Sequence, residues 1–234
     1  MKEKSSINFS KQVFFIPLCM VFVIWFVYMF ELKFSLNFNV FGILPRTIKG
    51  LRGIVFSPFI HANVTHLFNN SVPLFVLGSI LFMFYNKVSF KVLVYGTLLT
   101  GLLTWFIGRE SYHIGASGVV YLLFSFIFFS GVLKKHFRLI AVSLVTIFLY
   151  GGMVWYVLPI AKGISWEGHL SGFIVGTVFA YFYKNVGIVK EEYTFSKTDF
   201  DVMFDSHGNY IPPQEEETQL NDINYTYIYK SEEE

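Results

Sequence analysis

Long apolar runs, separated by short polar breaks, occupy the first 184 residues of this 234-residue chain. A helix needs about 20 mostly apolar residues to cross about 30 Å of hydrocarbon, and six segments have this character. The breaks between them carry Gly, Asn, Lys, Arg and Glu, which are typical of turns at a membrane interface. The pattern therefore predicts an all-α polytopic membrane protein with six transmembrane helices, over residues 13–30, 66–85, 92–107, 115–133, 139–158 and 166–183.

The first connection, residues 32–65, is the longest, and a loop of this length is more often functional than a mere linker. The first apolar segment is long for the core of a signal peptide and no A-x-A site follows it, so we expect an uncleaved first helix. Three regions follow from this pattern. They are a cytoplasmic N-terminal segment (1–11), a six-helix membrane domain (12–184) and a short, acidic C-terminal tail (185–234).

The composition narrows the class of protein. Of all residues, 54% are hydrophobic and only 15% are charged, whereas a soluble domain has about 25% charged residues. This excludes a soluble single domain and a disordered chain. A formal net charge of +2 without a basic stripe argues against nucleic-acid binding. The single cysteine, Cys19, excludes an intramolecular disulfide framework and a cysteine zinc site, and we expect no metal or cofactor.

Lysine and arginine are unequally distributed over the ends of the six segments. With a cytoplasmic N-terminus, ten of these residues lie near inner ends and six lie near outer ends. The positive-inside rule therefore predicts that both termini are cytoplasmic. The compact core of six segments suits a plasma (inner) membrane. The tail has twelve acidic and three basic residues, which is typical of a solvated and mostly flexible chain.

Polar side chains are costly in lipid and mark function or helix packing, and three clusters lie at the predicted outer ends. The first cluster, at the start of the second segment, contains His61, His66 and Asn70. His66 and Asn70 are four residues apart, so they share one helix face. Taken alone, this cluster also fits interfacial anchoring or hydrogen bonding between helices.

The second cluster opens the fourth segment with Gly115, Ser117 and Gly118, and Tyr121 lies on the same face as Ser117. Small residues in a membrane helix usually permit close helix packing, so this cluster alone is weak evidence for catalysis.

The third cluster, on the sixth segment, places His169, Gly172 and Gly176 on one stripe, where glycine lets a neighbouring helix approach. A single histidine is more often a structural group than a catalyst. The coincidence of the three clusters carries more weight, because the second, fourth and sixth segments all enter from the same side of the membrane.

We therefore expect Ser117, His169 and His66 at a similar depth. Serine becomes nucleophilic when a base accepts its proton, and histidine is the usual base near neutral pH. Asn70, His66 and the amides that begin the fourth helix can donate hydrogen bonds to an oxyanion.

An acidic third member of a triad is not expected. Glu167 is two residues from His169 and would face away from it on a helix. The sequence therefore predicts a Ser–His dyad, with the ring of Tyr121 helping to hold the imidazole.

These residues resemble the rhomboid family of intramembrane serine proteases over residues 12–184. The resemblance is carried by H-x4-H-x3-N, G-x-S-G-x-x-Y and H-x2-G-x3-G, which occur here as His61, His66 and Asn70, then Gly115, Ser117, Gly118 and Tyr121, then His169, Gly172 and Gly176.

The resemblance implies that Ser117 is the nucleophile and His169 the general base. It implies an oxyanion hole made of His66, Asn70 and the Ser117 amide. It also implies a mobile loop, residues 159–167, above the site, and transmembrane protein substrates that enter from the lipid bilayer near helices two and five.

One position departs from the family pattern, because Leu51-Arg52 stands where many members have Trp-Arg. An alternative is an inactive rhomboid-like protein that binds or escorts membrane proteins, although such relatives usually lose the serine or the histidine. A small transporter is a third class; it would bury charges at the midplane or repeat broken helices, and neither pattern is present. The sequence makes no prediction of oligomeric state.

Overall fold

The computed structural model describes residues 11–149, 155–159, 163–186, 198–211 and 226, and the chain divides into two units after Lys190. Within these ranges the regular secondary structure is helical, and two isolated β-bridges join Ile43 to His113 and Phe204 to Tyr210. The predicted all-α class therefore holds for the described part of the chain.

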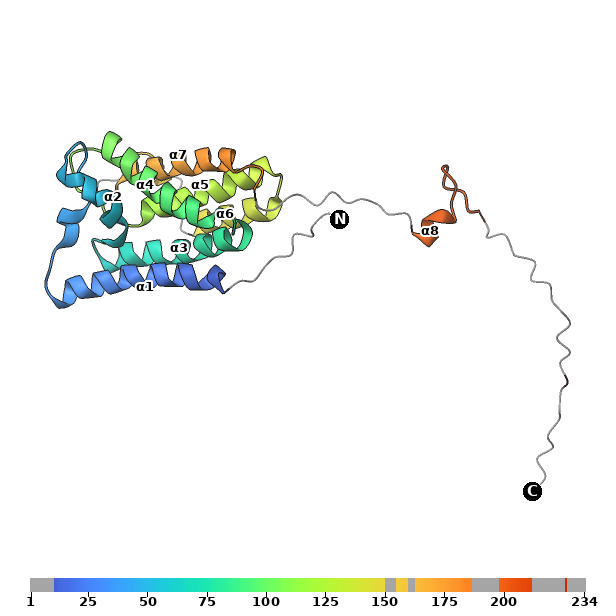
Figure 1. Cartoon of the computed structure of the whole chain (residues 1–234), viewed down its shortest axis with the longest axis horizontal. Coiled ribbons are helices and arrows are strands. Elements are labelled where there is room, and N and C mark those ends of the chain that lie inside the picture. The colour runs from blue at the N-terminus through green and yellow to red at the C-terminus, as the bar shows by residue number, and fades with distance from the viewer. Residues whose placement is uncertain (1–10, 150–154, 160–162, 187–197, 212–225, 227–234) are drawn as a thin grey trace, which may run out of the picture. The chain divides into compact units, whose positions relative to one another are not determined.

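Six helices of the first unit lie side by side (Figure 1). Three of them, α1, α3 and α4, are long and apolar enough to cross a membrane, and α5 is a shorter apolar helix. The six are α1 (Gln12–Lys33), α3 (Val64–Phe84), α4 (Ser89–Ile107), α5 (Ser117–Leu133), α6 (Phe137–Leu149) and α7 (Trp166–Phe182).

The fifth apolar segment was expected to run to residue 158, and this expectation was wrong. Helix α6 is described as Phe137–Leu149, and Trp155–Val157 form the 3-10 turn η4 and not a continuation of the α-helix; positions 150–154 lie outside the described residues. Apolar composition alone therefore overestimated the length of this helix.

Helix α5 lies at the centre of the unit and packs most extensively against α7. Most of its side chains are buried, as expected for a helix that is apolar on almost all sides. Glycines on α7 allow this contact, since a Cβ atom at Gly172 would lie 2.1 Å from the carbonyl oxygen of Gly118, and one at Gly176 would lie 2.2 Å from that of Leu122. The small residues thus bring the two backbones together.

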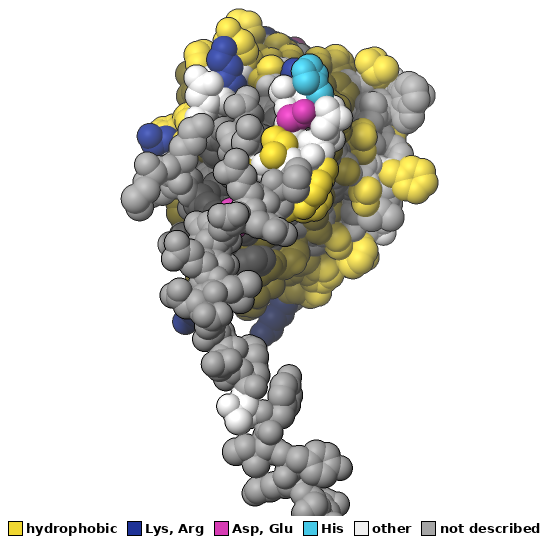
Figure 2. Space-filling model, turned by 90° about the vertical axis from the view of Figure 1, so that its right-hand side faces the viewer, with side chains coloured by type: hydrophobic (Ala, Val, Ile, Leu, Met, Phe, Trp, Pro, Cys, Tyr) yellow, Lys and Arg dark blue, Asp and Glu magenta, His cyan; other side chains and the backbone are white. Residues whose placement is uncertain are grey.

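On the outside of the unit, in contrast to the buried centre, large apolar side chains are exposed. On α1, Phe22 is 68% and Phe26 is 58% exposed, and Phe182 on α7 is 73% exposed. Figure 2 shows hydrophobic side chains over much of the visible surface and Lys or Arg only at scattered points. Such a surface suits contact with lipid and not with water.

The long first connection is folded into short helical turns that lie against α4. Trp105 Nε1 on α4 donates a hydrogen bond to the carbonyl oxygen of Thr47 (2.9 Å), and Arg46 Nη1 donates one to that of Gly108 (2.6 Å). These turns are η1 (Phe38–Phe41), η2 (Lys49–Arg52), α2 (Gly53–Phe56) and η3 (Ser57–Phe59).

Arg52, beside the unusual Leu51, has a structural role in this loop. Its Nη2 donates to the carbonyl oxygen of Val40 (2.8 Å), and its guanidinium lies 4.4 Å from the centre of the Phe41 ring. The Arg52 side chain thus links the turn η2, which contains it, to the turn η1, which contains Val40 and Phe41.

The described part of the second unit contains a short helix, α8 (Asp199–Val202), which begins with a capping box between Thr198 and Asp201. Asp205 accepts hydrogen bonds from the amides of His207 and Asn209, both at 2.8 Å. This local turn was not among the expectations for a flexible tail. Residues 187–197, 212–225 and 227–234 of the tail lie outside the described residues.

Candidate active site

Two side chains from different helices form a direct hydrogen bond. Ser117 is the first residue of α5, and His169 lies in the first turn of α7. Ser117 Oγ is 2.8 Å from His169 Nε2. The two helices approach closely through Gly118 and Gly172, so the packing predicted from the glycine stripe brings these two side chains within reach of each other.

The second nitrogen of the His169 ring determines the direction of that hydrogen bond. Nδ1 lies 2.9 Å from the carbonyl oxygen of Tyr156, in η4. A carbonyl oxygen can only accept, so Nδ1 carries the proton. In the neutral ring, Nε2 is then an acceptor, and the Ser117 hydroxyl donates to it. This is the arrangement in which a histidine can remove a proton from serine.

Tyr121 lies one helical turn after Ser117 and packs against the imidazole. The ring centres of Tyr121 and His169 are 4.3 Å apart, and the two planes differ by 16°. Stacked rings restrict rotation of the imidazole about its side-chain torsions. The tyrosine ring therefore holds the histidine in the orientation that its two hydrogen bonds require.

The backbone before Ser117 is fixed by the first cluster and by the first loop. The amide of Gly115 donates to the carbonyl oxygen of Ser57 (2.9 Å), and the amide of Ala116 donates to His61 Nε2 (3.4 Å). Burial lowers the pKa of the His61 imidazole to about 3. This histidine is therefore neutral near pH 7, as an acceptor must be.

His66 and Asn70 lie beside this same backbone. Gly115 has φ +104°, and a Cβ atom there would lie 2.7 Å from His66 Nε2 and 3.5 Å from Asn70 Nδ2. Only glycine adopts this conformation readily and leaves room for both side chains. Asn70 is 5% exposed, and its Nδ2 has no hydrogen-bond partner within the described part of the chain. A buried donor therefore points toward the backbone that precedes Ser117.

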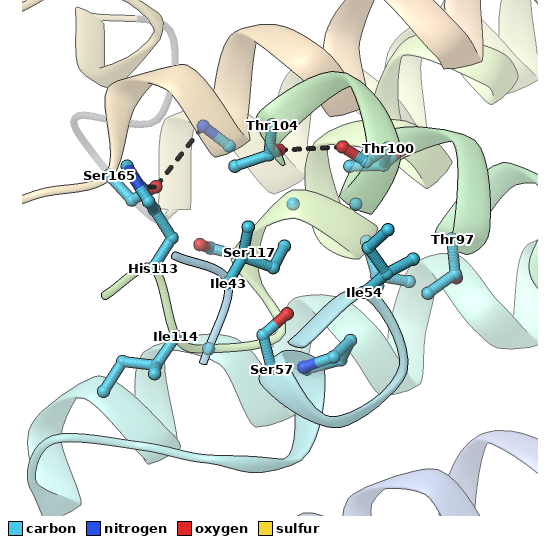
Figure 3. Close-up of a pocket in the computed structure, with 16 residues that line it drawn as sticks. Ile43, Ile54, Ser57, Thr97, Thr100, Thr104, His113, Ile114, Ser117 and Ser165 are labelled. Atoms are coloured by element: carbon cyan, nitrogen blue, oxygen red, sulfur yellow. Dashed lines mark hydrogen bonds between the residues drawn. The ribbon is translucent and has the colours of Figure 1, made fainter. Parts of the chain in front are cut away.

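A small cavity of about 30 Å³ adjoins Ser117 (Figure 3). Its wall includes the side chains of Ser57, Thr100 and Thr104. A buried water needs roughly 10–15 Å³ and two to four polar partners, so this cavity has room for about two water molecules. Hydroxyl groups and space for water thus lie next to the serine.

Some polar groups near the site were not predicted to take part in it. The carbonyl oxygen of Tyr156 carries no side-chain signal, so sequence reasoning had no means of finding it. His113 and Ser165 were also missed. The sequence held a signal for them, because His113 lies four residues before Ser117 and Ser165 lies four residues before His169. Glu167, which was expected to face away from His169, contacts Arg109 instead. Among the described residues no group of three His, Cys, Asp or Glu could hold a metal ion.

The profile of the Rhomboid domain matches residues 49–185, which is more than half of the chain. The chain belongs to the rhomboid family. Together with its long apolar helices, this makes it a multi-pass membrane protein with the fold of a family of intramembrane serine proteases.

Three relatives show how far the similarity extends. An uncharacterized protein of Mycobacterium tuberculosis is 36% identical over 156 residues, 61% of this chain and 63% of that protein. An uncharacterized protein of Mycobacterium leprae is 33% identical over 162 residues, 64% of this chain and 62% of that protein. A protein of Acanthamoeba polyphaga mimivirus, whose description includes the word rhomboid, is 31% identical over 133 residues, 52% of this chain and 68% of that protein. The matches thus span less than two thirds of either mycobacterial protein.

Proposed function

We propose that this rhomboid is an active intramembrane serine endopeptidase that cleaves transmembrane segments of other proteins with a Ser117–His169 dyad. The observation that carries the proposal is the 2.8 Å contact between Ser117 Oγ and His169 Nε2. The other ring nitrogen, Nδ1, donates a hydrogen bond to the carbonyl oxygen of Tyr156, which leaves Nε2 free to accept. An inactive relative would have no need to keep this hydrogen-bonded pair.

The chemistry follows from this arrangement. Ser117 Oγ attacks the peptide carbonyl while His169 Nε2 accepts its proton. His169 then protonates the leaving amine, and water from the adjoining cavity hydrolyses the acyl-enzyme with the same histidine as base. The carbonyl oxygen of Tyr156 stabilises the imidazolium that forms in both halves of the reaction, because it accepts from Nδ1 throughout.

The oxyanion of the tetrahedral intermediate needs donors that are in place before the reaction. Asn70 Nδ2 lacks a partner in the described structure and lies close to Gly115. The amides of Ser117 and Gly118 belong to the first turn of α5, where no intrahelical acceptor exists. We assign the oxyanion hole to these amides, Asn70 and His66.

Replacing Asn70 tests this assignment. We expect Asn70→Ala to lower kcat for cleavage by about 10²–10³, the usual effect of losing one oxyanion donor. The matched control is Asn69→Ala, which removes the same side chain from the exposed neighbouring position on α3. Kinetics of reporter cleavage by both variants measure the difference. Equal, small losses in the two variants would restrict Asn70 to a structural role.

The membrane arrangement belongs to the same proposal. We assign α1, α3, α4, α5, α6 and α7 as six spans of the plasma membrane, within a domain of residues 12–184, with both termini in the cytoplasm. The excess of Lys and Arg at the predicted inner ends supports this orientation. The dyad then opens to the outer side, where water reaches it, and substrates enter laterally from the bilayer.

A helical substrate hides its carbonyl groups in backbone hydrogen bonds, so the cleaved segment must unwind. We therefore expect single-span substrates with Gly or Pro near their outer end and a small residue before the scissile bond. Cleavage of two reporters in proteoliposomes tests the function, one with Gly-Pro in that region and one with Leu-Ala. The first should be cut faster. No cleavage of either, with no labelling by a fluorophosphonate probe, would favour the inactive, substrate-binding class.

A further inference from the structure

A buried carboxylate lies next to the dyad and is not bonded to it. Glu167 is only 1% exposed and lies two residues before His169. Its Oε1 accepts a hydrogen bond from the amide of Arg109 (3.2 Å) and is 3.6 Å from Nε of the same residue. Burying an unpaired carboxylate is strongly unfavourable, and even a paired one loses the hydration that it has in water. The fold thus retains a costly ion pair at the beginning of the helix that carries the base.

The same two segments are joined a second time by His113 and Ser165 (Figure 3). His113 Nε2 lies 3.1 Å from the carbonyl oxygen of Arg109, so Nε2 carries the proton and Nδ1 accepts from the Ser165 hydroxyl at 2.6 Å. Ser165 Oγ in turn accepts from the amide of Gly168 and caps α7. Burial lowers the pKa of His113, which favours this neutral state.

A third contact links the same region, because Arg109 Nη2 donates to the carbonyl oxygen of Ile164. We call the four side chains that make these contacts the polar clamp: Arg109, His113, Ser165 and Glu167. One half of the clamp belongs to the connection that precedes α5, and the other half belongs to the start of α7.

Each half of the clamp is continuous with one member of the dyad. His113 is four residues before Ser117, and the backbone between them is held at Gly115 and Ala116 by the hydrogen bonds described above. Glu167 is two residues before His169 in the same helix. A shift between the two halves is therefore transmitted directly to the Ser117–His169 distance.

We infer that the polar clamp positions the two members of the dyad, and that Arg109 and Glu167 are positioning residues for the proposed hydrolysis. This inference rests on the proposed function, in which the serine–histidine distance controls the rate. An error of about 1 Å in such a contact can lower a rate by as much as 10²-fold. Neither residue touches the substrate or the reacting atoms in this account; both act through the separation of α5 and α7.

The test uses two readouts of the dyad in the full chain. The first is the second-order rate of labelling by a fluorophosphonate probe, measured per folded molecule. We expect Glu167→Gln and Arg109→Gln each to lower this rate by about 10-fold or more, and the double variant to be no slower than the slower single variant. The matched control is Glu110→Gln, which removes an exposed carboxylate from the same connection and should leave the rate unchanged.

The second readout does not require hydrolysis. In a Cys19→Ser background, the Ser117→Cys variant places a thiol beside His169. When Nε2 accepts the thiol proton, the resulting imidazolium stabilises the thiolate and lowers the thiol pKa below about 8.5. The pH profile of alkylation by iodoacetamide measures this pKa. His66 and Tyr121 also face the pair, and they are kept in every variant compared. Adding Glu167→Gln or Arg109→Gln should return the profile toward that of an unpaired thiol.

The outcomes separate the two claims. If the unsubstituted chain is not labelled but the alkylation profile responds to Glu167→Gln, the proposed function fails and the clamp stands. If both clamp variants lower only the unfolding temperature, while the labelling rate and the profile stay unchanged, the inference is overturned. If either variant does not fold, Ser165→Ala is tested in its place. This substitution removes the hydrogen bond between Ser165 and His113 and keeps the ion pair between Arg109 and Glu167.

Discussion

Ser117→Ala is expected to abolish both cleavage of a membrane-spanning reporter and labelling by a fluorophosphonate probe. The substitution removes the hydroxyl oxygen that we propose as the nucleophile, whereas the helix that carries it remains intact. Alanine is a good helix former, and its methyl group is smaller than the side chain it replaces. We therefore expect the unfolding temperature to stay within a few degrees of the unsubstituted chain. Mass spectrometry of the unsubstituted protein after labelling would locate the adduct on the peptide that contains Ser117.

Ser125→Ala is the matched control for this variant. Ser125 lies two turns further along α5 and is fully buried, and its hydroxyl donates to the carbonyl oxygen of Tyr121 in its own helix. Its replacement should leave labelling and cleavage close to normal. Residual cleavage by the Ser117→Ala variant above the rate in empty liposomes would contradict the role assigned to Ser117.

Gly172→Ala is expected to have an effect nearly as large, through packing. A Cβ atom at this position would lie 2.1 Å from the carbonyl oxygen of Gly118, and the backbone of α5 cannot yield as a flexible side chain could. Helices α5 and α7 must therefore separate, and the Ser117–His169 hydrogen bond must lengthen. Overpacking of this kind destabilises by about 1–3 kcal/mol or more. We expect a lower unfolding temperature and a labelling rate reduced by about 10²-fold.

The comparison for this variant is Gly78→Ala on α3. A Cβ atom there would lie 3.1 Å from the side chain of Pro17 and 4.0 Å from its nearest backbone atom, which is an ordinary van der Waals distance. The same methyl group should therefore have a much smaller effect on both measurements. If the two alanine variants behaved alike, the close approach of α5 and α7 would not be what brings the dyad together.

The positions of the helices were largely predictable, because apolar runs and polar breaks report directly on burial in lipid. The helices that begin at Val64, Ser89 and Ser117 each start within three residues of the predicted segments. The fifth segment shows the limit of this reasoning. Its apolar composition continues to residue 158, but Trp155–Val157 form a 3-10 turn, and hydropathy does not distinguish such a turn from an α-helix. The folding of the first loop was also not predictable, since its turns depend on hydrogen bonds to α4 such as that of Trp105.

The candidate site was predictable where side-chain chemistry and helical spacing coincide. Ser117, His169 and Tyr121 combine both signals, and the structure brings these three side chains into contact. The contacts that complete the site are of another kind. Every residue type has a backbone carbonyl oxygen like that of Tyr156. The pairing of Glu167 with Arg109 depends on where the segments that carry them lie relative to each other in the fold. Neither leaves a pattern in a single sequence.

The hydrogen bond from His169 to the carbonyl oxygen of Tyr156 makes the state of the proposed base insensitive to one kind of change and sensitive to another. Any amino acid at position 156 supplies the same oxygen, so mutation of that side chain leaves the tautomer of the imidazole unchanged. A displacement of the main chain there has the opposite effect, because it lets the ring rotate or exchange its proton between nitrogens. The basicity of this centre is therefore controlled by the path of the polypeptide beside it rather than by the chemical identity of a neighbour.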